Sequence, residues 1–376
     1  MARPFREYHL FQLLRRFDNQ HLPLDLFLSH YFRAHRAIGS KDRLFIVEAV
    51  YGIIRWKSLL DHLAEGHPSW EKRYRIYQNF QPYNYLRVNT IPLHIRLSFP
   101  EELTEVLLEE FGEEETIRLG QVSSCSAPIA VRVNPLKCDR QTLMQKWEGL
   151  FEISEGYLSP YAILFKKRTP LTSLPEFKEG LFEIQDEASQ HVADLIEAKP
   201  GDHVLDYCAG AGGKTLAFAH KTEGKGQIYL HDIRPIILDR AKKRLKRAGI
   251  QNAQYTADRH KLKPNMDWIL VDAPCTGTGT YRRNPDQKWK FTKKQLERVV
   301  LEQREIFANA LKLLKPGGKI VYATCSLLKK ENEEQVEYFM KKYSLELVRE
   351  PFRTHYCLGY ADALFGAVLQ NVSSTV

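Results

Sequence analysis

The sequence predicts an α/β protein whose C-terminal half is a Rossmann-like domain, preceded by a small α+β module and an all-helical N-terminal domain. Three observations predict this fold. A glycine-rich turn follows an apolar strand, strands alternate with helices beyond that turn, and apolar residues recur every three or four positions near the start. With 376 residues, 43% of them hydrophobic, the chain is long enough for two or three domains with cores of their own.

The glycine-rich turn lies within Asp202 to Thr215 (DHVLDYCAGAGGKT). A short apolar strand stops there, and helical spacing begins again at Lys214. Three glycines let backbone N–H groups approach a ligand at the N-terminus of that helix: Gly210, Gly212 and Gly213. An ordinary tight turn is the alternative for such a cluster taken alone.

Two kinds of ligand compete for this turn. Its ending, GKT, is typical of a phosphate-binding P-loop, but that pattern needs a glycine where Cys208 stands. A nucleoside-containing cofactor instead requires an acidic residue at the end of the next strand, where it binds the ribose hydroxyls. The next strand, GQIYLHD, supplies Asp232 at that place. The second interpretation is therefore favoured.

The alternation of strands and helices after the turn predicts a parallel sheet with right-handed crossovers. Ligands of such sheets gather at the carboxyl ends of the strands. Six chemically competent residues fall at strand ends: Asp206, Asp232, Asp258, Asp272, Cys275 and Cys325. One cysteine alone is more often a small buried residue. Both cysteines here stand where a strand gives way to a loop, which provides the exposure that a reactive thiol needs.

The chain divides into four predicted parts. Residues 1–66 form a helical domain, 67–125 a helical connector, 126–200 the small α+β module and 201–376 the Rossmann-like domain. Up to residue 60, ten Lys or Arg stand against five Asp or Glu, and the whole chain has a net charge of +9. Such a balance favours a polyanionic partner such as nucleic acid, with a solvated basic face as an equal alternative.

Several further expectations follow from composition and pattern. No apolar run reaches membrane-spanning length and the start has no signal-peptide core, so we expect a cytoplasmic protein without a membrane partner. The six cysteines form no CxxC pair, so we expect no metal. A monomer is the simplest expectation. The basic run from Arg240 to Arg247 is interpreted as a solvated helix face, whereas Tyr281–Arg283 is placed to hold a phosphate backbone.

Several motifs together carry a family resemblance: EIQDEAS, LDYCAGAGGKT, DAPCTGTGTYRRNPD followed by KWK, LKPGGKIVYATCS followed by ENE, and DALFGAVL. On these, the sequence resembles the RNA (cytosine-5) methyltransferases of the RsmB/Nop/Sun family, specifically the bacterial branch that acts on small-subunit ribosomal RNA. The resemblance runs from about residue 126 to about residue 370. Ala211, Asn284 and Ala363 depart from the family's usual proline, histidine and glycine.

The helical start contains DRLFIVEAVYGIIRW, which is similar to the antitermination-factor-like RNA-binding domain of the bacterial branch. The resemblance thus implies that residues 1–66 bind RNA. The small α+β module, 126–200, is expected to bind RNA as well. The region ahead of QDEAS is shorter than is usual in that branch.

The resemblance also implies the chemistry. The cofactor is S-adenosyl-L-methionine and the reaction is methylation of cytosine C5, which requires a thiolate to add first to C6. By resemblance, Cys325 is this nucleophile, Cys275 assists release, Asp272 contacts the cytosine edge, and Lys214 holds Asp272. The implied cofactor-binding residues are Cys208, Ala209, Gly210, Ala211, Gly212, Gly213, Lys214, Asp232, Asp258 and Asp272.

Three alternatives stay open at this point. The same chemistry on transfer RNA would leave every site residue unchanged. A P-loop NTPase would use Asp272 to bind its metal ion, and nucleotide hydrolysis would reveal it. A noncatalytic RNA-binding scaffold would keep the basic surface but would tolerate the loss of either thiol, and binding of the cofactor would count against it.

Overall fold

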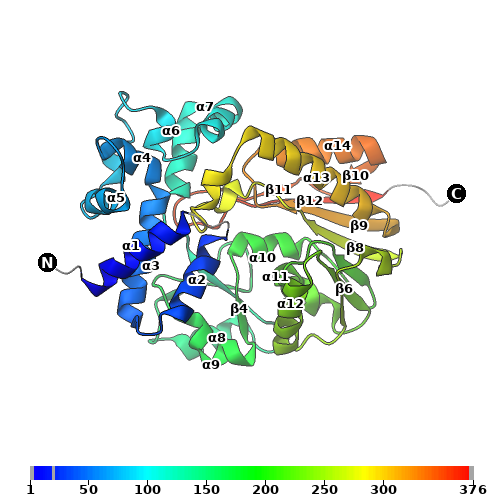
Figure 1. Cartoon of the computed structure of the whole chain (residues 1–376). Coiled ribbons are helices and arrows are strands. Elements are labelled where there is room, and N and C mark those ends of the chain that lie inside the picture. Colours follow the sequence, from blue (N-terminus) through cyan, green and yellow to red (C-terminus); the bar gives the residue numbers. More distant parts are fainter. Residues whose placement is uncertain (1–3, 19–21, 372–376) are drawn as a thin grey trace. The chain divides into compact units, whose positions relative to one another are not determined.

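The computed structural model describes residues 4–18 and 22–371. The outermost residues of the predicted first and last domains (1–3 and 372–376), and residues 19–21, lie outside the described residues. The chain divides into two compact units (Figure 1). One consists of Met1–Ser126 and Thr280–Gln295, and the other of Ala127–Gly279 and Leu296–Val376. In the part of the chain that is described, no helix is long and apolar enough to cross a membrane.

The first unit is helical, as the apolar spacing predicts. Leu10, Leu13 and Leu14 are fully buried in its core. The segment 280–295 belongs to this unit, where the Trp289 indole Nε1 donates to the Ile54 carbonyl at 2.9 Å. The helices are α1 (Phe5–Phe17), α2 (Leu24–Ala34), α3 (Ser40–Arg55), α4 (Lys57–Leu63), α5 (Trp70–Tyr77), α6 (Leu93–Arg96) and α7 (Glu101–Ser123), the last interrupted at Gly112.

The second unit begins with the predicted small α+β module. Its four-stranded antiparallel sheet has the order β2-β3-β1-β4. Trp147 is 1% exposed and meets Phe165 and Phe182 edge-on, with ring centroids 5.4 and 5.2 Å away. The elements are β1 (Ile129–Val133), α8 (Arg140–Trp147), β2 (Ile153–Glu155), β3 (Ala162–Phe165), α9 (Pro175–Glu179) and β4 (Phe182–Ile184).

The larger, eight-stranded sheet of this unit has the order β10-β12-β9-β8-β5-β6-β7, with β11 paired to β12. The strands from β5 to β9 are parallel, as predicted, whereas β10, β11 and β12 add antiparallel pairs. The predicted parallel arrangement therefore holds for the strands from β5 to β9, and antiparallel strands extend the sheet beyond β9. The strands are β5 (His203–Asp206), β6 (Gln227–His231), β7 (Ala253–Thr256), β8 (Met266–Asp272), β9 (Leu314–Thr324), β10 (Leu345–Leu347), β11 (Phe352–Arg353) and β12 (Phe365–Asn371).

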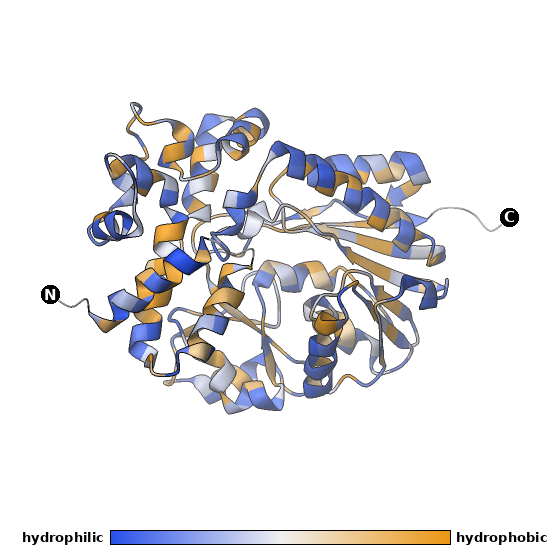
Figure 2. Cartoon of the chain, in the orientation of Figure 1, coloured by the Kyte–Doolittle hydropathy of each residue, from blue (hydrophilic) through white to orange (hydrophobic). Residues whose placement is uncertain are grey.

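Helices cover both faces of the larger sheet (Figure 1). Successive strand residues point to opposite faces, so Val204 packs with α11 and α12 while Leu205 belongs to the core under α13 and α14. Figure 2 shows the strands as largely apolar and α12 as predominantly hydrophilic. The helices of this unit are α10 (Glu187–Asp194), α11 (Gly213–Phe218), α12 (Pro235–Ala248), α13 (Lys293–Leu311, of which 293–295 lie in the first unit) and α14 (Glu333–Tyr343).

The order of the parallel strands creates a topological switch point. From β5 the chain moves outward to β6 and β7, then returns to place β8 and β9 on the other side of β5. The connections therefore leave in opposite directions at the carboxyl ends of β5 and β8, and a crevice opens there. Asp206 ends β5 and Asp272 ends β8, so the fold positions both carboxylates at this crevice.

We predict that Trp147→Ala destabilises the protein by about 3–5 kcal/mol, because it empties the aromatic centre of the module. Leu150→Ala is the matched control, since Leu150 is 69% exposed and its loss is expected to change stability by about 0.5 kcal/mol or less. Urea unfolding measures both. Equal effects of the two changes would contradict this account of the core.

Candidate functional site

A cavity of about 1040 Å³ lies at the carboxyl edge of the larger sheet. It is near the upper end of the roughly 300–1,000 Å³ that is usual for small-molecule sites. Residues at the ends of β5, β6, β7 and β8 line it, together with the glycine-rich turn and part of α13. The predicted residues among its walls are Asp206, Cys208, Ala209, Gly210, Ala211, Gly213, Lys214, Asp232, Asp258 and Asp272. The fold thus brings together most of the predicted site.

Three predicted residues do not line this cavity: Gly212, Cys275 and Cys325. Gly212 has φ of +74°, and a Cβ there would lie 2.8 Å from Leu245 Cδ1 on α12. Glycine is needed at this position because the turn packs closely against the helix in a left-handed conformation. In contrast, a Cβ on Gly210 would meet no atom within 4 Å, so that side of the turn is open.

Asp232 connects the end of β6 to the glycine-rich turn. Its Oδ2 accepts a hydrogen bond from the Gly210 backbone N–H at 2.9 Å, and Arg234 donates to both of its carboxylate oxygens at 2.8 and 2.9 Å. Burial alone would raise the pKa of Asp232, but the hydrogen bonds from Arg234 and Gly210 outweigh it and lower the pKa. Asp232 is therefore a negatively charged acceptor at the cavity wall.

Asp206 has an unmatched oxygen beside the cavity. Its side chain is almost fully buried, and Oδ2 accepts from the Thr215 hydroxyl at 2.6 Å. Oδ1 is buried and has no hydrogen-bond partner among the described residues. Burial raises the pKa of Asp206 to about 7 despite the Thr215 hydrogen bond, and the negative charge of Asp272 adds to the increase.

Lys214 and Asp272 form an ion pair across the cavity wall. Lys214 Nζ lies 2.5 Å from Asp272 Oδ2, and the lysine side chain is only 12% exposed. Burial by itself would lower the pKa of Lys214, but the charge and hydrogen bond of Asp272 raise it overall. The start of α11 and the end of β8 are thus joined by a charged contact.

The two cysteines lie beside each other just beyond the strand ends. Cys275 follows β8, Cys325 follows β9, and their Sγ atoms are 3.3 Å apart. Both residues are half-buried and free of disulfides. They adjoin the cavity through the chain, because Asp272 and Pro274 both line it. The hydrogen bond with Cys325, together with burial, raises the pKa of Cys275 well above its ordinary value.

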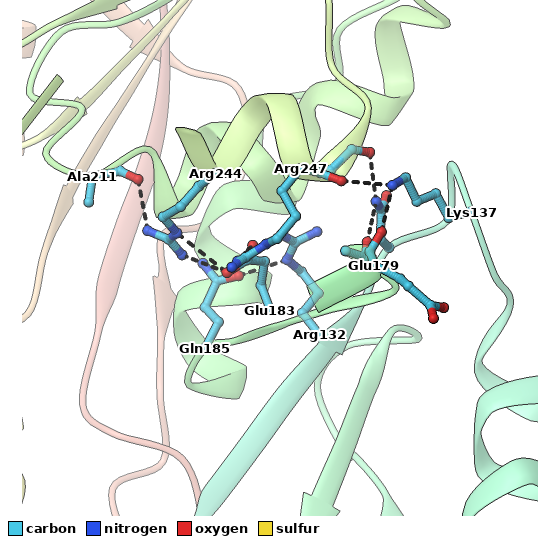
Figure 3. A network of polar contacts seen from close by, with 11 residues as sticks. Arg132, Lys137, Glu179, Glu183, Gln185, Ala211, Arg244 and Arg247 are labelled. Carbon is cyan, nitrogen blue, oxygen red and sulfur yellow. Dashed lines mark hydrogen bonds and ion pairs between the residues drawn. The ribbon is translucent and has the colours of Figure 1, made fainter. Parts of the chain in front are cut away.

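A polar network that the sequence reasoning missed holds the glycine-rich turn (Figure 3). Arg244, on α12, donates to the Ala211 carbonyl at 2.7 Å and to Glu183 of β4 at 3.1 Å. Gln185 donates to the Gly213 carbonyl at 3.1 Å and accepts from buried Arg132 at 2.8 Å. The small module therefore fixes the turn from one side and α12 from the other. Gln185 was part of the EIQDEAS motif, which was the only sequence signal for it.

The interpretation of the basic run as a solvated face is right in part. Four of its side chains are exposed: Arg240, Lys242, Lys243 and Lys246. Arg244 and Arg247 instead form ion pairs with Glu183, which is 4% exposed. Helical periodicity decides the difference, because positions three apart share a face.

Arg282 also differs from its interpretation as a phosphate contact. It is 2% exposed in the first unit, and its backbone carbonyl accepts a hydrogen bond from Arg55 at 2.9 Å. Tyr281, beside it, is 1% exposed. Burial removes both side chains from the surface that a phosphate backbone contacts.

The donors and acceptors of the cavity suit S-adenosylmethionine, which carries a ribose and two cationic groups, a sulfonium and an ammonium. Asp232 offers the ribose acceptor, and several carboxylates of the lining suit the two cationic groups. The carboxylates of that lining are Asp206, Asp232, Asp258, Asp272, Glu302 and Glu305. Fold and site together define the class of S-adenosylmethionine-dependent methyltransferases with a Rossmann-like domain.

Comparison with known proteins narrows the class. Residues 193–362 match the model of a family described as 16S rRNA methyltransferase RsmB/F. A relative from Synechocystis sp., named probable ribosomal RNA small subunit methyltransferase B, is 31% identical over 277 residues, which cover 72% of this chain and 62% of the relative. Residues 193–362 of this chain are thus similar to the RsmB/F family. The chain spans less than two thirds of that relative's length.

Solved structures agree on the fold. The crystal structure of PH0851 aligns with a TM-score of 0.81 and 23% identity over 98% of this chain and 99% of that one. A methyltransferase homologue from Pyrococcus horikoshii aligns with a TM-score of 0.67 and 26% identity over 74% of this chain and 97% of that one. The α/β fold with a helical N-terminal region is thus shared with known proteins.

We predict that Arg244→Met weakens binding of S-adenosylmethionine about tenfold, the effect of losing roughly one charge-assisted hydrogen bond. The change releases the Ala211 carbonyl and leaves Glu183 with fewer positive partners. Isothermal titration calorimetry measures the dissociation constant. Lys243→Met, on the exposed face of α12, is the control, and equal affinities of the two variants would contradict the role of the network.

We predict that Asp206→Asn stabilises the ligand-free protein increasingly as the pH rises from about 4 to about 7. The folded state raises the pKa of Asp206 to about 7 and so retains a proton that the unfolded chain releases near pH 4. Between these values rising pH therefore costs the wild type stability that the uncharged variant keeps, up to about 4 kcal/mol. Urea unfolding at several pH values measures the difference in unfolding free energy between the variant and the wild type. A difference that does not change with pH would contradict the prediction, as would an equal difference for the exposed variant Asp239→Asn.

Proposed function

We propose that this protein methylates C5 of a cytosine in RNA, in small-subunit ribosomal RNA, using S-adenosylmethionine and a covalent cysteine adduct at C6. One observation carries the proposal: two free thiols lie 3.3 Å apart at the ends of adjacent parallel strands, next to a cavity suited to the cofactor. The family of residues 193–362 and the name of the Synechocystis relative support the ribosomal substrate.

The two thiols answer a chemical requirement. Cytosine C5 is too weak a nucleophile to be methylated directly, so the Cys325 thiolate adds to C6 and makes C5 the nucleophilic carbon of an enamine. When bound, S-adenosylmethionine supplies the methyl group. The C5 proton then leaves to a base, the C5–C6 double bond re-forms, and the C6–S bond breaks to return the Cys325 thiolate, with Cys275 assisting this release.

The ion pair at the end of β8 has a place in this scheme. We assign Asp272 to the cytosine edge, where sharing a proton with N3 stabilises the negative charge that develops on the ring. Lys214, 2.5 Å from Asp272, holds that carboxylate in place. Lys214 is on α11 and Asp272 is at the end of β8. The ion pair between these two elements keeps the Asp272 carboxylate in one position during the reaction.

The cofactor assignments follow the walls of the cavity. We assign Asp232 to the ribose hydroxyls, Asp258 to the adenine and the turn from Cys208 to Lys214 to the methionine portion. Arg234 pairs with Asp232 in the ligand-free protein, and its side chain is 63% exposed, so it is free to turn outward when the hydroxyls take its place. The proposed chemistry requires no metal.

RNA binding is assigned to the basic helical residues 1–66 and to the small module, 126–200. A net charge of +9 suits a phosphate backbone. The target cytosine must leave its stack for a thiol to reach C6, at a cost of a few kcal/mol that contacts elsewhere offset. The proposal includes action as a monomer in the cytoplasm, where ribosomal subunits are assembled.

The arrangement of the turn disfavours a P-loop NTPase. Such a loop needs free backbone N–H groups for phosphate, whereas the Gly210 N–H donates to the Asp232 carboxylate. Lys214, which would contact phosphate, is already paired with Asp272, and the cavity lining is acidic. A noncatalytic scaffold would have no use for two adjacent thiols beside such a cavity.

We predict that Cys275→Ala accumulates a covalent protein–RNA adduct, because the nucleophile still adds to C6 but release is impaired. The measurement is a denaturing gel of purified protein incubated with total RNA and S-adenosylmethionine. The adduct is expected to disappear in the double variant Cys275→Ala/Cys325→Ala. Cys325→Ala alone is expected to abolish methyl transfer.

Cys357→Ala is the matched control, since Cys357 is a free, half-buried thiol outside the cavity lining. Methyl transfer by Cys325→Ala would show that the nucleophile is misassigned. Methylation of transfer RNA in place of ribosomal RNA would show that the substrate is misassigned but that the proposed reaction is correct. Binding of RNA without methylation by the wild type would favour the scaffold.

A further inference from the structure

Glu331, outside the residues assigned so far, lies at the centre of the two cysteine loops. It ends a short 3-10 helix after β9 and is 0% exposed. Its Oε1 accepts from the Thr276 backbone N–H at 2.8 Å and from Gln303 Nε2 at 3.0 Å. Its Oε2 accepts from the Thr276 hydroxyl at 2.5 Å and from the Ser326 hydroxyl. One buried carboxylate therefore binds the residues that directly follow Cys275 and Cys325.

The residues that precede the two cysteines are held as well. Gln303, on α13, donates to the Pro274 carbonyl at 3.0 Å. Asn332, next to Glu331, accepts from the Thr324 hydroxyl at 2.5 Å and donates to the Ser326 carbonyl at 3.0 Å. Every chain neighbour of both cysteines thus bonds to Gln303, Glu331 or Asn332, which we call the loop clamp.

The loop clamp is itself fixed by the fold. The Tyr322 hydroxyl, inside β9, donates to the Glu331 backbone carbonyl at 2.7 Å and to Gln303 Oε1 at 3.1 Å. Gln335 Nε2 donates to Gln303 Oε1 at 2.8 Å. A buried polar network with its members satisfied has one low-energy arrangement, because breaking any bond leaves an unpaired group in a dry site. The 3.3 Å distance between the thiols follows from that arrangement.

The carboxylate also acts on the thiols through its charge. Burial raises the pKa of Glu331, whereas the bonds from Ser326, Thr276 and Gln303 lower it. The pKa of Cys275 is raised by its hydrogen bond with Cys325, by burial, and by the negative charges of Cys325 and Glu331. The charge of Cys325 in turn raises the pKa of Lys214. Tyr322 interacts with Glu331 and Cys275, and Arg304 lowers the pKa of Tyr322.

We propose that Glu331 is a positioning residue that holds the two thiols together and keeps Cys275 in its protonated form. The Cys275 S–H then has Cys325 Sγ within hydrogen-bonding distance, at 3.3 Å. The buried Glu331 carboxylate disfavours a negative charge on Cys275, because it binds the residue next to that thiol. The role of Glu331 in methyl transfer rests on the proposed function, whereas its effect on the protonation of Cys275 does not.

The test measures each thiol separately. Iodoacetamide alkylation of the purified full-length protein over a range of pH, followed by peptide mass spectrometry, gives the pH midpoint at which Cys275 and Cys325 each react. Glu331→Gln keeps the size and an acceptor oxygen but removes the charge, so the Cys275 midpoint is expected to fall by about one pH unit.

Glu331→Ala removes the bonds as well as the charge. The Cys275 midpoint is expected to fall as in Glu331→Gln, and the rate constant of methyl transfer is expected to fall about tenfold or more, with little change in the KM for S-adenosylmethionine. Glu331→Gln is expected to restore most of that rate. Glu334→Gln, on the exposed side of α14, is the control for charge outside the clamp.

Equal Cys275 midpoints in wild type, Glu331→Gln and Glu334→Gln would overturn the proposal. Circular dichroism during thermal melting shows whether Glu331→Ala is folded. If it is not, the Cys275 midpoint of Glu331→Gln alone tests the proposal. If the midpoints shift as expected while the wild type methylates no RNA, the proposed function fails and the positioning role stands.

Discussion

The parallel pairing of β8 with β9 is the constraint on which the site depends. Their register sets Asp272 beside Ala323, so the two strands end at nearly the same level. Cys275 and Cys325 follow these ends, and 50 residues of chain separate thiols that lie 3.3 Å apart. Backbone hydrogen bonds between extended strands leave little freedom in register, because a slip of one residue turns every side chain to the other face.

Around the cavity, carboxylates are paired with cations from neighbouring elements. Carboxylates meet at one edge of the sheet, which on its own would be unfavourable, and cations on neighbouring elements compensate. Arg234 pairs with Asp232, and Lys214 pairs with Asp272. Asp206 keeps one buried oxygen without a hydrogen-bond partner among the described residues, and burial raises its pKa to about 7.

The sequence was sufficient for what depends on local pattern. Strand periodicity, the glycine-rich turn and the placement of acids after strands located the walls of the cavity, including Lys214, Asp232 and Asp258. It misjudged Arg244, because a basic residue in a basic run has no local feature that separates a buried ion pair from a solvated face. It also gave no role to Glu331, although the ENE motif contains this residue, since glutamate is most often exposed.

What the sequence by itself determined is therefore the order of elements, the class of fold and the residues that end each strand, since these follow from periodicity and backbone conformational preference. Only the tertiary structure decided which strand ends meet, which cations neutralise which carboxylates, and that the loops carrying the two cysteines share one buried carboxylate. The physical reason is that burial and long-range pairing set those energies, and neither is visible in the spacing of residues along the chain.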